Sequence, residues 1–336
     1  MNYTRIRLHL SIKTAVLALG AQSKSAFCFV KGNTAYLSDS GGDLSDLENF
    51  KKFERDIKGF QKKLKIKPRV IACDLHPEYV STKYALRTTK IQHHEAHIAS
   101  CIADNNIKGK VIGIAFDGTG FGSDGNIWGG EFFVGGIKGL KRAAHLKYIP
   151  MPGGEASIKE PWRMAFSYLY DVYGKERDWP RPEGSALPRT FRPRSLRPPP
   201  LVARLCNDIL GQMIDKKINS PLTSSMGRLF DGVSALIGIC AFARYEGEAA
   251  VELEKEICAA NLENLTRLEL PDYKFNIITN KEVFILELDM VIRGIVNDLE
   301  SNVARSVISL KFHNTVCCMI KETCNLLRKR YKIEKV

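Results

Sequence analysis

No apolar run in the 336-residue chain is long enough to cross a membrane. A membrane-spanning helix needs about 20 consecutive apolar residues, and the longest candidate, Gly232–Ala243, is shorter and is typical of a buried helix. The N-terminal region resembles a secretory signal only in outline, because its apolar stretch at 15–21 is brief and runs into strand-like alternation. We therefore predict no membrane association and a cytoplasmic location.

The cysteines lack the pairing that a disulfide framework would need. Nine cysteines are scattered along the chain, and no two form a C-x-x-C pair. An odd number without regular spacing is typical of reduced thiols in the cytoplasm. Cys317 and Cys318 are adjacent on a predicted helix, so their side chains point in different directions and predict no pair of metal ligands.

The basic residues lack the interleaved aromatic side chains on which nucleic-acid bases stack. The formal net charge is +13, and much of the excess lies in residues 177–204 and in a C-terminal Lys/Arg cluster. A solvated basic surface explains this charge best, followed by attraction of an acidic partner or a nucleotide. We therefore do not expect nucleic acid as a partner.

One histidine-rich segment, IQHHEAHIAS at 91–100, offers metal ligands. On a helix, His93 and His97 project from the same face one turn apart. Neutral imidazole nitrogens at this spacing can bind one cation such as zinc or iron. The segment is not the metalloprotease motif H-E-x-x-H, because Ile98 stands where that motif needs its second histidine. A histidine-rich helix end without a metal remains the alternative.

A glycine-rich turn follows the histidine segment. The apolar run Val111–Phe116 predicts a buried strand that ends at Asp117, and the turn after it contains Gly118, Thr119 and Gly120. Such a turn presents a carboxylate and backbone N–H groups without Cβ atoms in the way, so it can bind phosphate oxygens. A plain tight hairpin is the alternative, since Asp-Gly pairs are common in turns.

The order of predicted elements indicates an α/β protein with two lobes. Residues 1–14 have mixed polarity and are expected to form a leader, possibly a disordered one. The first lobe, 15–110, opens with three predicted antiparallel strands and a helix, at 16–20, 25–30, 34–38 and 43–65, with a hairpin turn at 31–33. The strand–hairpin pattern repeats from residue 111, which begins the second lobe.

The second lobe, 111–336, includes a segment that cannot form a core. Residues 177–204 are rich in proline and arginine without periodicity, and they predict an exposed, disordered loop. Later, a run of hydroxyl residues predicts a helix N-terminus, with Arg228 and Asp231 three residues apart on that helix. A surface ion pair of small energetic weight is the alternative for these two. Residues 332–336 resemble a strand that stops, so we expect a truncated lobe.

Five motifs occur in the order found in one protein family. They are IQHHEAHIASC, AFDGTGFGSDGNIWGGEFFVG, PMPGGEASIKEPWRMA, NSPLTSSMGRLFDGVSALIG and ARYEGEAAVELE. The sequence from about residue 16 to 336, apart from the Arg/Pro-rich segment, resembles the C-terminal portion of the hydrogenase-maturation carbamoyltransferases called HypF. The resemblance implies a two-lobed fold of the actin/hexokinase/heat-shock ATPase (ASKHA) type, similar to enzymes that make threonylcarbamoyladenosine in tRNA and to antibiotic O-carbamoyltransferases.

The resemblance also implies a reaction. In HypF-like proteins this module receives carbamoyl-adenylate, which a separate domain makes from carbamoyl phosphate and ATP with magnesium. The carbamoyl group passes to the C-terminal cysteine thiolate of a HypE-like protein, and AMP leaves. Two alternatives remain: an O-carbamoyltransferase for a small molecule, and a catalytically incomplete fragment that only binds a partner.

The resemblance assigns roles to residues of the motifs. The ligands of a divalent zinc or iron ion would be His93, His97 and Asp117. The nucleotide and its phosphate would be bound by Gly118, Thr119, Gly120, Gly153, Gly154 and Asp231. His94 and Arg228 would be catalytic, His94 as a proton carrier or as a support for a ligand. The upstream domains of the family are missing, and its late glycine-rich segment and aspartate ligand would lie beyond Val336. We therefore expect that the chain cannot make carbamoyl-adenylate unaided.

Overall fold

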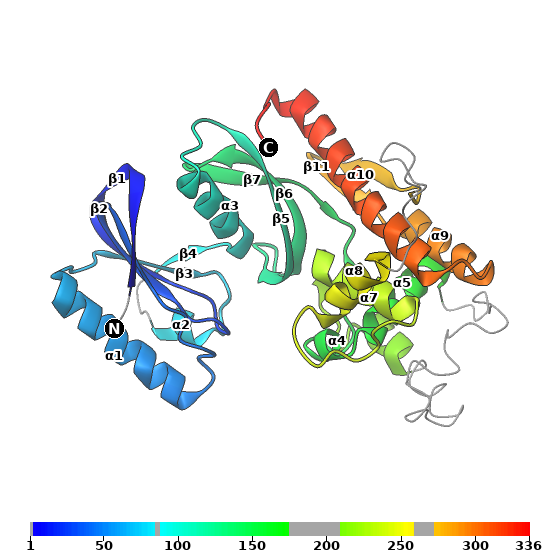
Figure 1. The fold of residues 1–336 in the computed structure, drawn as a ribbon, viewed down its shortest axis with the longest axis horizontal. Coiled ribbons are helices and arrows are strands. Elements are labelled where there is room, and N and C mark those ends of the chain that lie inside the picture. The colour runs from blue at the N-terminus through cyan, green and yellow to red at the C-terminus, as the bar shows by residue number, and fades with distance from the viewer. Residues whose placement is uncertain (1–2, 85–87, 175–208, 259–271) are drawn as a thin grey trace. The chain divides into compact units, whose positions relative to one another are not determined.

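The computed structural model describes residues 3–84, 88–174, 209–258 and 272–336. These residues form two compact units, each of mixed helices and strands (Figure 1). By residue number, unit 1 comprises 1–109, 120–125 and 136–140, and unit 2 comprises 110–119, 126–135 and 141–336. The predicted Arg/Pro-rich loop at 177–204 lies outside the described residues.

The two units and the predicted lobes have different bounds. The first boundary comes after residue 109, beside the predicted boundary after residue 110. Two hairpin turns of the predicted second lobe, 120–125 and 136–140, are grouped with unit 1 instead. Strand β5 (Val111–Phe121) therefore begins in unit 2 and ends in unit 1.

Unit 1 is built on a four-stranded sheet in the order β2-β1-β3-β4. β1 and β2 are antiparallel, whereas β3 runs parallel to both β1 and β4. The strands are β1 (Tyr3–Leu19), β2 (Phe27–Ser38), β3 (Val70–Asp74) and β4 (Thr89–Ile91); the helices are α1 (Leu47–Leu64), α2 (Val80–Tyr84) and α3 (His93–Asp104).

Helix α1 lies within the predicted helix at 43–65 and buries one apolar face. Asp46 caps the helix, since its side chain accepts hydrogen bonds from the first backbone N–H groups. Phe53, Ile57 and Phe60 are buried in the core that α1 shares with the sheet, and the rings of Phe27 and Phe60 lie 4.9 Å apart. Each buried side chain of this size stabilises the fold by about 1.5–3 kcal/mol. This face therefore holds α1 on the sheet.

Two predictions for the start of the chain are wrong. Residues 3–14 belong to β1 rather than to a disordered leader, because their backbone pairs with β2 from Tyr3 opposite Ser38. The predicted hairpin turn at 31–33 lies inside β2. Gly32 adopts a φ of +63° and faces Ile12, where the pairing register of β1 shifts. A left-handed glycine in a strand is typical of such a bulge, which the sequence alone does not distinguish from a turn.

Unit 2 contains a seven-stranded sheet. The order is β10-β11-β7-β6-β9-β8, and β5 pairs with β6. Besides β5, the strands are β6 (Ile127–Gly136), β7 (Gly139–Leu146), β8 (Ile149–Pro150), β9 (Leu222–Thr223), β10 (Asn276–Asn280) and β11 (Val283–Glu287). The helices are α4 (Ala156–Lys159), α5 (Trp162–Tyr173), α7 (Met226–Leu236), α8 (Glu248–Cys258), α9 (Asp289–Glu300) and α10 (Arg305–Tyr331).

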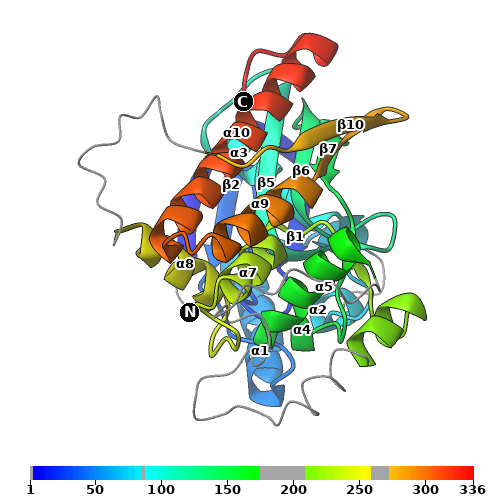
Figure 2. The ribbon, with the colours of Figure 1, turned by 90° about the vertical axis from the view of Figure 1, so that its right-hand side faces the viewer.

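The helices of unit 2 share one core with its sheet. Phe132 of β6, Leu229 of α7 and Phe312 of α10 are all buried there. Figure 2 shows α10 as the long red helix running past α9. Helix α5 begins directly after Pro161, as a first-turn proline predicts.

The end of the described chain differs from its prediction. Residues 332–336 form no strand, although Lys335 O accepts a backbone hydrogen bond of 2.8 Å from Ile112 of β5. None of the described helices combines the length and the apolar character that crossing a membrane requires.

Candidate metal centre and phosphate loop

The histidine segment forms the first turns of α3. Gln92 caps this helix, and its Oε1 accepts from the N–H of Glu95 at 3.0 Å. Because the helix begins at His93, the side chains of His93 and His97 leave the same face, as their spacing predicts. Their Nε2 atoms lie 3.1 Å apart. Two imidazole nitrogens therefore meet at one point in unit 1.

Asp74 orients the first of these rings. It ends strand β3, and its Oδ2 lies 2.7 Å from Nδ1 of His93. A carboxylate only accepts, so Nδ1 of a neutral His93 carries the hydrogen and Nε2 keeps its lone pair toward His97. Burial raises the pKa of Asp74, but hydrogen bonds from His93 and from the N–H of His76 outweigh it and hold that pKa below its usual value. Asp74 is therefore an anion at neutral pH.

The histidine pair fits a single metal ion. Ligand nitrogens about 2.0–2.1 Å from a tetrahedral zinc ion are about 3.3 Å from each other, close to the 3.1 Å observed between the two Nε2 atoms. A carboxylate bound to the other nitrogen of a ligating histidine is the usual support of such sites. The donor set therefore suits zinc or iron(II).

His94 has a different environment from its neighbours. It is completely buried, and its Nδ1 lies 3.1 Å from Nε2 of Gln92. The amide nitrogen can only donate, so Nδ1 of His94 accepts and Nε2 carries the hydrogen of the neutral ring. Gly120 lies against this ring, since a Cβ there would be 2.5 Å from Cε1 of His94. The burial favours a supporting role over proton exchange with solvent.

The predicted turn at 118–120 is wrong, because β5 continues to Phe121. In unit 2, Asp117 and Gly118 of this strand lie against the N-terminus of α7. The side chain of Asp117 accepts a 2.6 Å hydrogen bond from the N–H of Gly118. Oγ of Ser225, the N-cap of α7, lies 3.0 Å from the carbonyl oxygen of Asp117 and 2.5 Å from that of Gly118. A Cβ at Gly227 would be 2.9 Å from Cα of Gly118. Two motifs that the sequence presents separately therefore meet here.

The predicted phosphate ligands Gly153 and Gly154 use their N–H groups within unit 2. Both have positive φ, of +94° and +55°, which explains why glycine occupies these positions. The N–H of Gly153 donates to Asn219 O at 2.8 Å, and that of Gly154 donates to Met151 O at 3.0 Å. Their amides are thus engaged in holding the loop.

Arg228 and Asp231 form a buried ion pair. Nη2 of Arg228 lies 2.8 Å from Oδ2 of Asp231, and the two side chains are only 4% and 5% exposed. The surface-pair alternative is therefore wrong. Burial, only partly offset by the charge of Arg228, raises the pKa of Asp231 to about 6. The charges of Arg228 and Asp231 both affect the pKa of Tyr168 of α5. The pair therefore lies close to the contact between α5 and α7.

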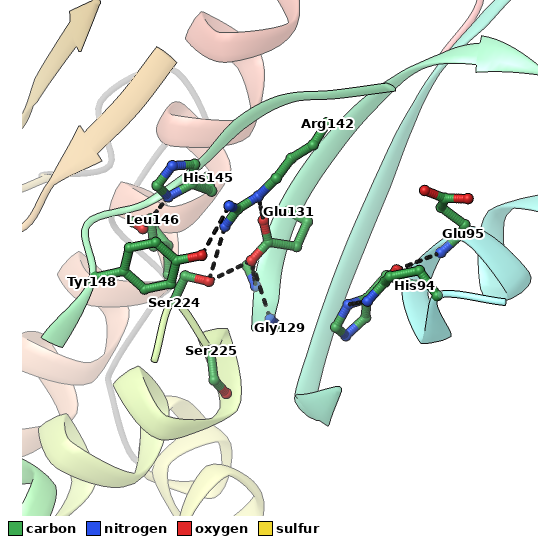
Figure 3. Close-up of polar contacts among 12 residues, drawn as sticks. His94, Glu95, Gly129, Glu131, Arg142, His145, Leu146, Tyr148, Ser224 and Ser225 are labelled. Carbon is green, nitrogen blue, oxygen red and sulfur yellow. Dashed lines mark hydrogen bonds and ion pairs between the residues drawn. The ribbon is translucent and has the colours of Figure 1, made fainter. Parts of the chain in front are cut away.

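A buried polar network in unit 2 is not among the features predicted from the sequence (Figure 3). Glu131 of β6 is fully buried and binds Arg142 of β7 and Ser224, which precedes the N-cap of α7. The role of Asp74 beside His93 is not predicted from the sequence either. The sequence does mark both carboxylates. Asp74 ends the apolar strand β3, as Asp117 ends its apolar run, and Glu131 is a lone charge in an apolar strand.

Two models of one protein family match the chain. The model described as the carbamoyltransferase, Kae1-like domain, second subdomain, matches residues 113–336. The model described as the HypF Kae1-like domain matches residues 11–104. Together they span both units.

Individual HypF proteins are similar over most of the chain. Carbamoyltransferase HypF of Synechocystis sp. is 33% identical over 314 residues, which are 91% of this chain and 39% of that protein. Carbamoyltransferase HypF2 of Cupriavidus necator is 36% identical over 251 residues, 71% of this chain and 28% of that protein. The chain therefore spans about two fifths or less of these relatives.

A solved structure confirms the predicted fold. The crystal structure of full-length HypF in the phosphate- and nucleotide-bound form superimposes with a TM-score of 0.83 and 36% identity, over 98% of this chain and 40% of that one. The HypF structure from T. kodakarensis gives a TM-score of 0.79 at 28% identity. The predicted two-lobed α/β fold and the resemblance to the C-terminal part of HypF are both confirmed.

Proposed function

The chain belongs to the HypF carbamoyltransferase family, and we propose that it transfers a carbamoyl group from carbamoyl-adenylate to the C-terminal cysteine of a HypE-like protein during hydrogenase maturation. The observation that carries this proposal is the histidine pair of α3, with Nε2 atoms 3.1 Å apart and one ring held by a buried carboxylate. We expect the reaction to take place in the cytoplasm.

The metal ligands of the proposal are His93, His97 and Asp117, each of which offers one ligand atom. Asp117 precedes Gly120 by three residues of β5, about 10 Å of extended chain, and Gly120 lies against His93 and His94 in unit 1. One oxygen of Asp117 accepts from the N–H of Gly118, and we assign a carboxylate oxygen of this residue to the ion. Zinc or iron bound here would supply a Lewis acid at a carbamoyl or phosphate oxygen.

The residues of β5 that follow the metal ligand Asp117 bind and orient the substrate. We assign the adenylate phosphate to Gly118, Thr119 and Gly120 near the end of β5, where glycines leave the backbone open to an anion. The thiolate of the partner forms a bond to the carbamoyl carbon, the bond from that carbon to the phosphate oxygen breaks, and AMP leaves with the electron pair. A protein nucleophile is not needed, because the acceptor thiolate is itself the attacking group.

The proposal is tested by supplying carbamoyl-adenylate directly. The metal-loaded chain should carbamoylate a peptide with the C-terminal sequence of a HypE-like protein, with AMP released in equal amount, as mass spectrometry and nucleotide chromatography would measure. His93→Ala combined with His97→Ala should remove the bound metal and reduce transfer at least a hundredfold. His9→Ala, an exposed histidine of the same unit, is the matched control and should change neither.

Three outcomes would count against the proposal. Unchanged metal content in the double variant would overturn the ligand assignment. Transfer to a small-molecule hydroxyl in preference to the thiol peptide would instead identify an O-carbamoyltransferase. Binding of the peptide without any transfer by the metal-loaded chain would identify a fragment that only binds its partner.

A further inference from the structure

Glu131 is a fully buried carboxylate, and both of its oxygens accept hydrogen bonds. Oε1 lies 2.5 Å from Oγ of Ser224 and 3.2 Å from the backbone N–H nitrogens of Gly129 and Gly130. Oε2 accepts from Nε of Arg142 at 2.5 Å. The carboxylate thus joins two neighbouring strands to the segment that leads into α7 (Figure 3).

The guanidinium of Arg142 is fixed from several sides. It lies 4.0 Å from the centre of the Trp128 ring, and its Nη1 donates to the hydroxyl of Tyr148 at 2.9 Å. Nη2 lies 3.3 Å from Oγ of Ser224. A planar group held by stacking and hydrogen bonds loses little freedom when it binds a carboxylate. Glu131 and Arg142 together therefore form a rigid anchor for Ser224.

The anchor reaches the predicted metal ligand through one peptide. Ser225 follows Ser224, and its hydroxyl holds the carbonyl oxygens of Asp117 and Gly118. The backbone segments at this contact are closely packed. A Cβ at Gly129 would be 2.6 Å from Asp117 O, and a Cβ at Gly130 would be 2.4 Å from Ser224 O. A shift of Ser224 is therefore passed on to the backbone of Asp117.

We propose that Glu131 is a positioning residue that sets the place of the Asp117 carboxylate through Ser224 and Ser225. A buried ion pair contributes little net stability compared with apolar side chains of the same size, because both charges must be desolvated. Its geometry, in contrast, is defined by four directed contacts. This inference rests on the proposed function, because it concerns Asp117 as a metal ligand.

Cobalt(II) is the probe that tests the inference, because its visible absorption reports the geometry of its ligands. Glu131→Gln keeps the size of the side chain and removes its charge, and it should lower the affinity for Co²⁺ about tenfold and shift the absorption bands, as loss of a supporting group does at metal sites. Ser224→Ala removes only the hydroxyl and should act in the same direction, so it decides the question if Glu131→Gln does not fold.

Glu282→Gln is the matched control. Glu282 is an exposed carboxylate paired with Lys141, the residue directly before Arg142, so the same substitution there should leave the cobalt affinity and spectrum unchanged. Cobalt binding by Glu131→Gln and Ser224→Ala that equals that of the unsubstituted chain would overturn the positioning role while the metal centre stands. Failure of the unsubstituted chain to bind cobalt would reject the metal centre, and the positioning role with it.

Discussion

The carboxylate of Asp74 determines which nitrogen of His93 is available to a metal ion. Its hydrogen bond of 2.7 Å to Nδ1 directs the lone pair of Nε2 toward His97. The negative charge also makes the ring a better donor to a cation. A side chain 19 residues away in the sequence therefore completes a site whose ligands lie within one helical turn.

Asp74→Asn should lower the affinity for zinc about 10–100-fold, the usual effect of losing a charged support of a ligating histidine. The amide keeps the size of the carboxylate, so the fold should be retained. Competition with a chromophoric chelator measures the affinity, and Asp56→Asn, which breaks the Lys52 pair on α1, is the control. Equal affinities for the two variants would show that Asp74 does not support the site.

At the scale of secondary-structure elements, the end of β5 is packed so closely on α3 that only glycine fits. A Cβ at Gly120 would lie 2.5 Å from Cε1 of His94 and 3.1 Å from Cβ of His93. Neither contact is the far end of a flexible side chain, since His94 is completely buried. The strand therefore fixes the first turn of the helix that carries both histidines.

Gly120→Ala should destabilise unit 1 by about 1–3 kcal/mol, the usual cost of overpacking a core, and should weaken metal binding because the first turn of α3 must move. Denaturant unfolding and metal titration measure the two effects. Gly139→Ala places the same methyl group at the start of β7, where no atom lies within 4 Å. If both variants behave alike, the contact with His94 has no such role.

Elements whose signals are local could be predicted from the sequence. The spacing of His93 and His97 and the hydroxyl cap of α7 depend on residues within a turn of one another, and both are found as predicted. The bulges that keep Gly32 inside β2 depend on the partner strand. Asp74 and Glu131 were missed for the same reason, because only tertiary contacts bring a carboxylate to its distant partner.

At the scale of the whole molecule, the proposed ligands are divided between two folding units. Each unit has its own buried core, one around Phe27 and Phe60 and the other around Phe132 and Leu229. His93 and His97 belong to unit 1, and Asp117 belongs to unit 2. The proposed ligand set therefore predicts that the ion stabilises both units, whereas an ion bound by the histidines alone would stabilise only one.

Hydrogen exchange distinguishes these two cases. A ligand that binds only the folded state adds a free energy of RT ln(1 + [L]/Kd) against unfolding, about 2.7 kcal/mol at a hundredfold excess over Kd. Zinc should therefore slow exchange of the amides of α3 and also of residues 113–119 of β5. Asp117→Asn should abolish the effect on β5 and weaken that on α3. Protection confined to α3 in the unsubstituted chain would remove Asp117 from the ligand set and leave the two histidines as the protein's contribution.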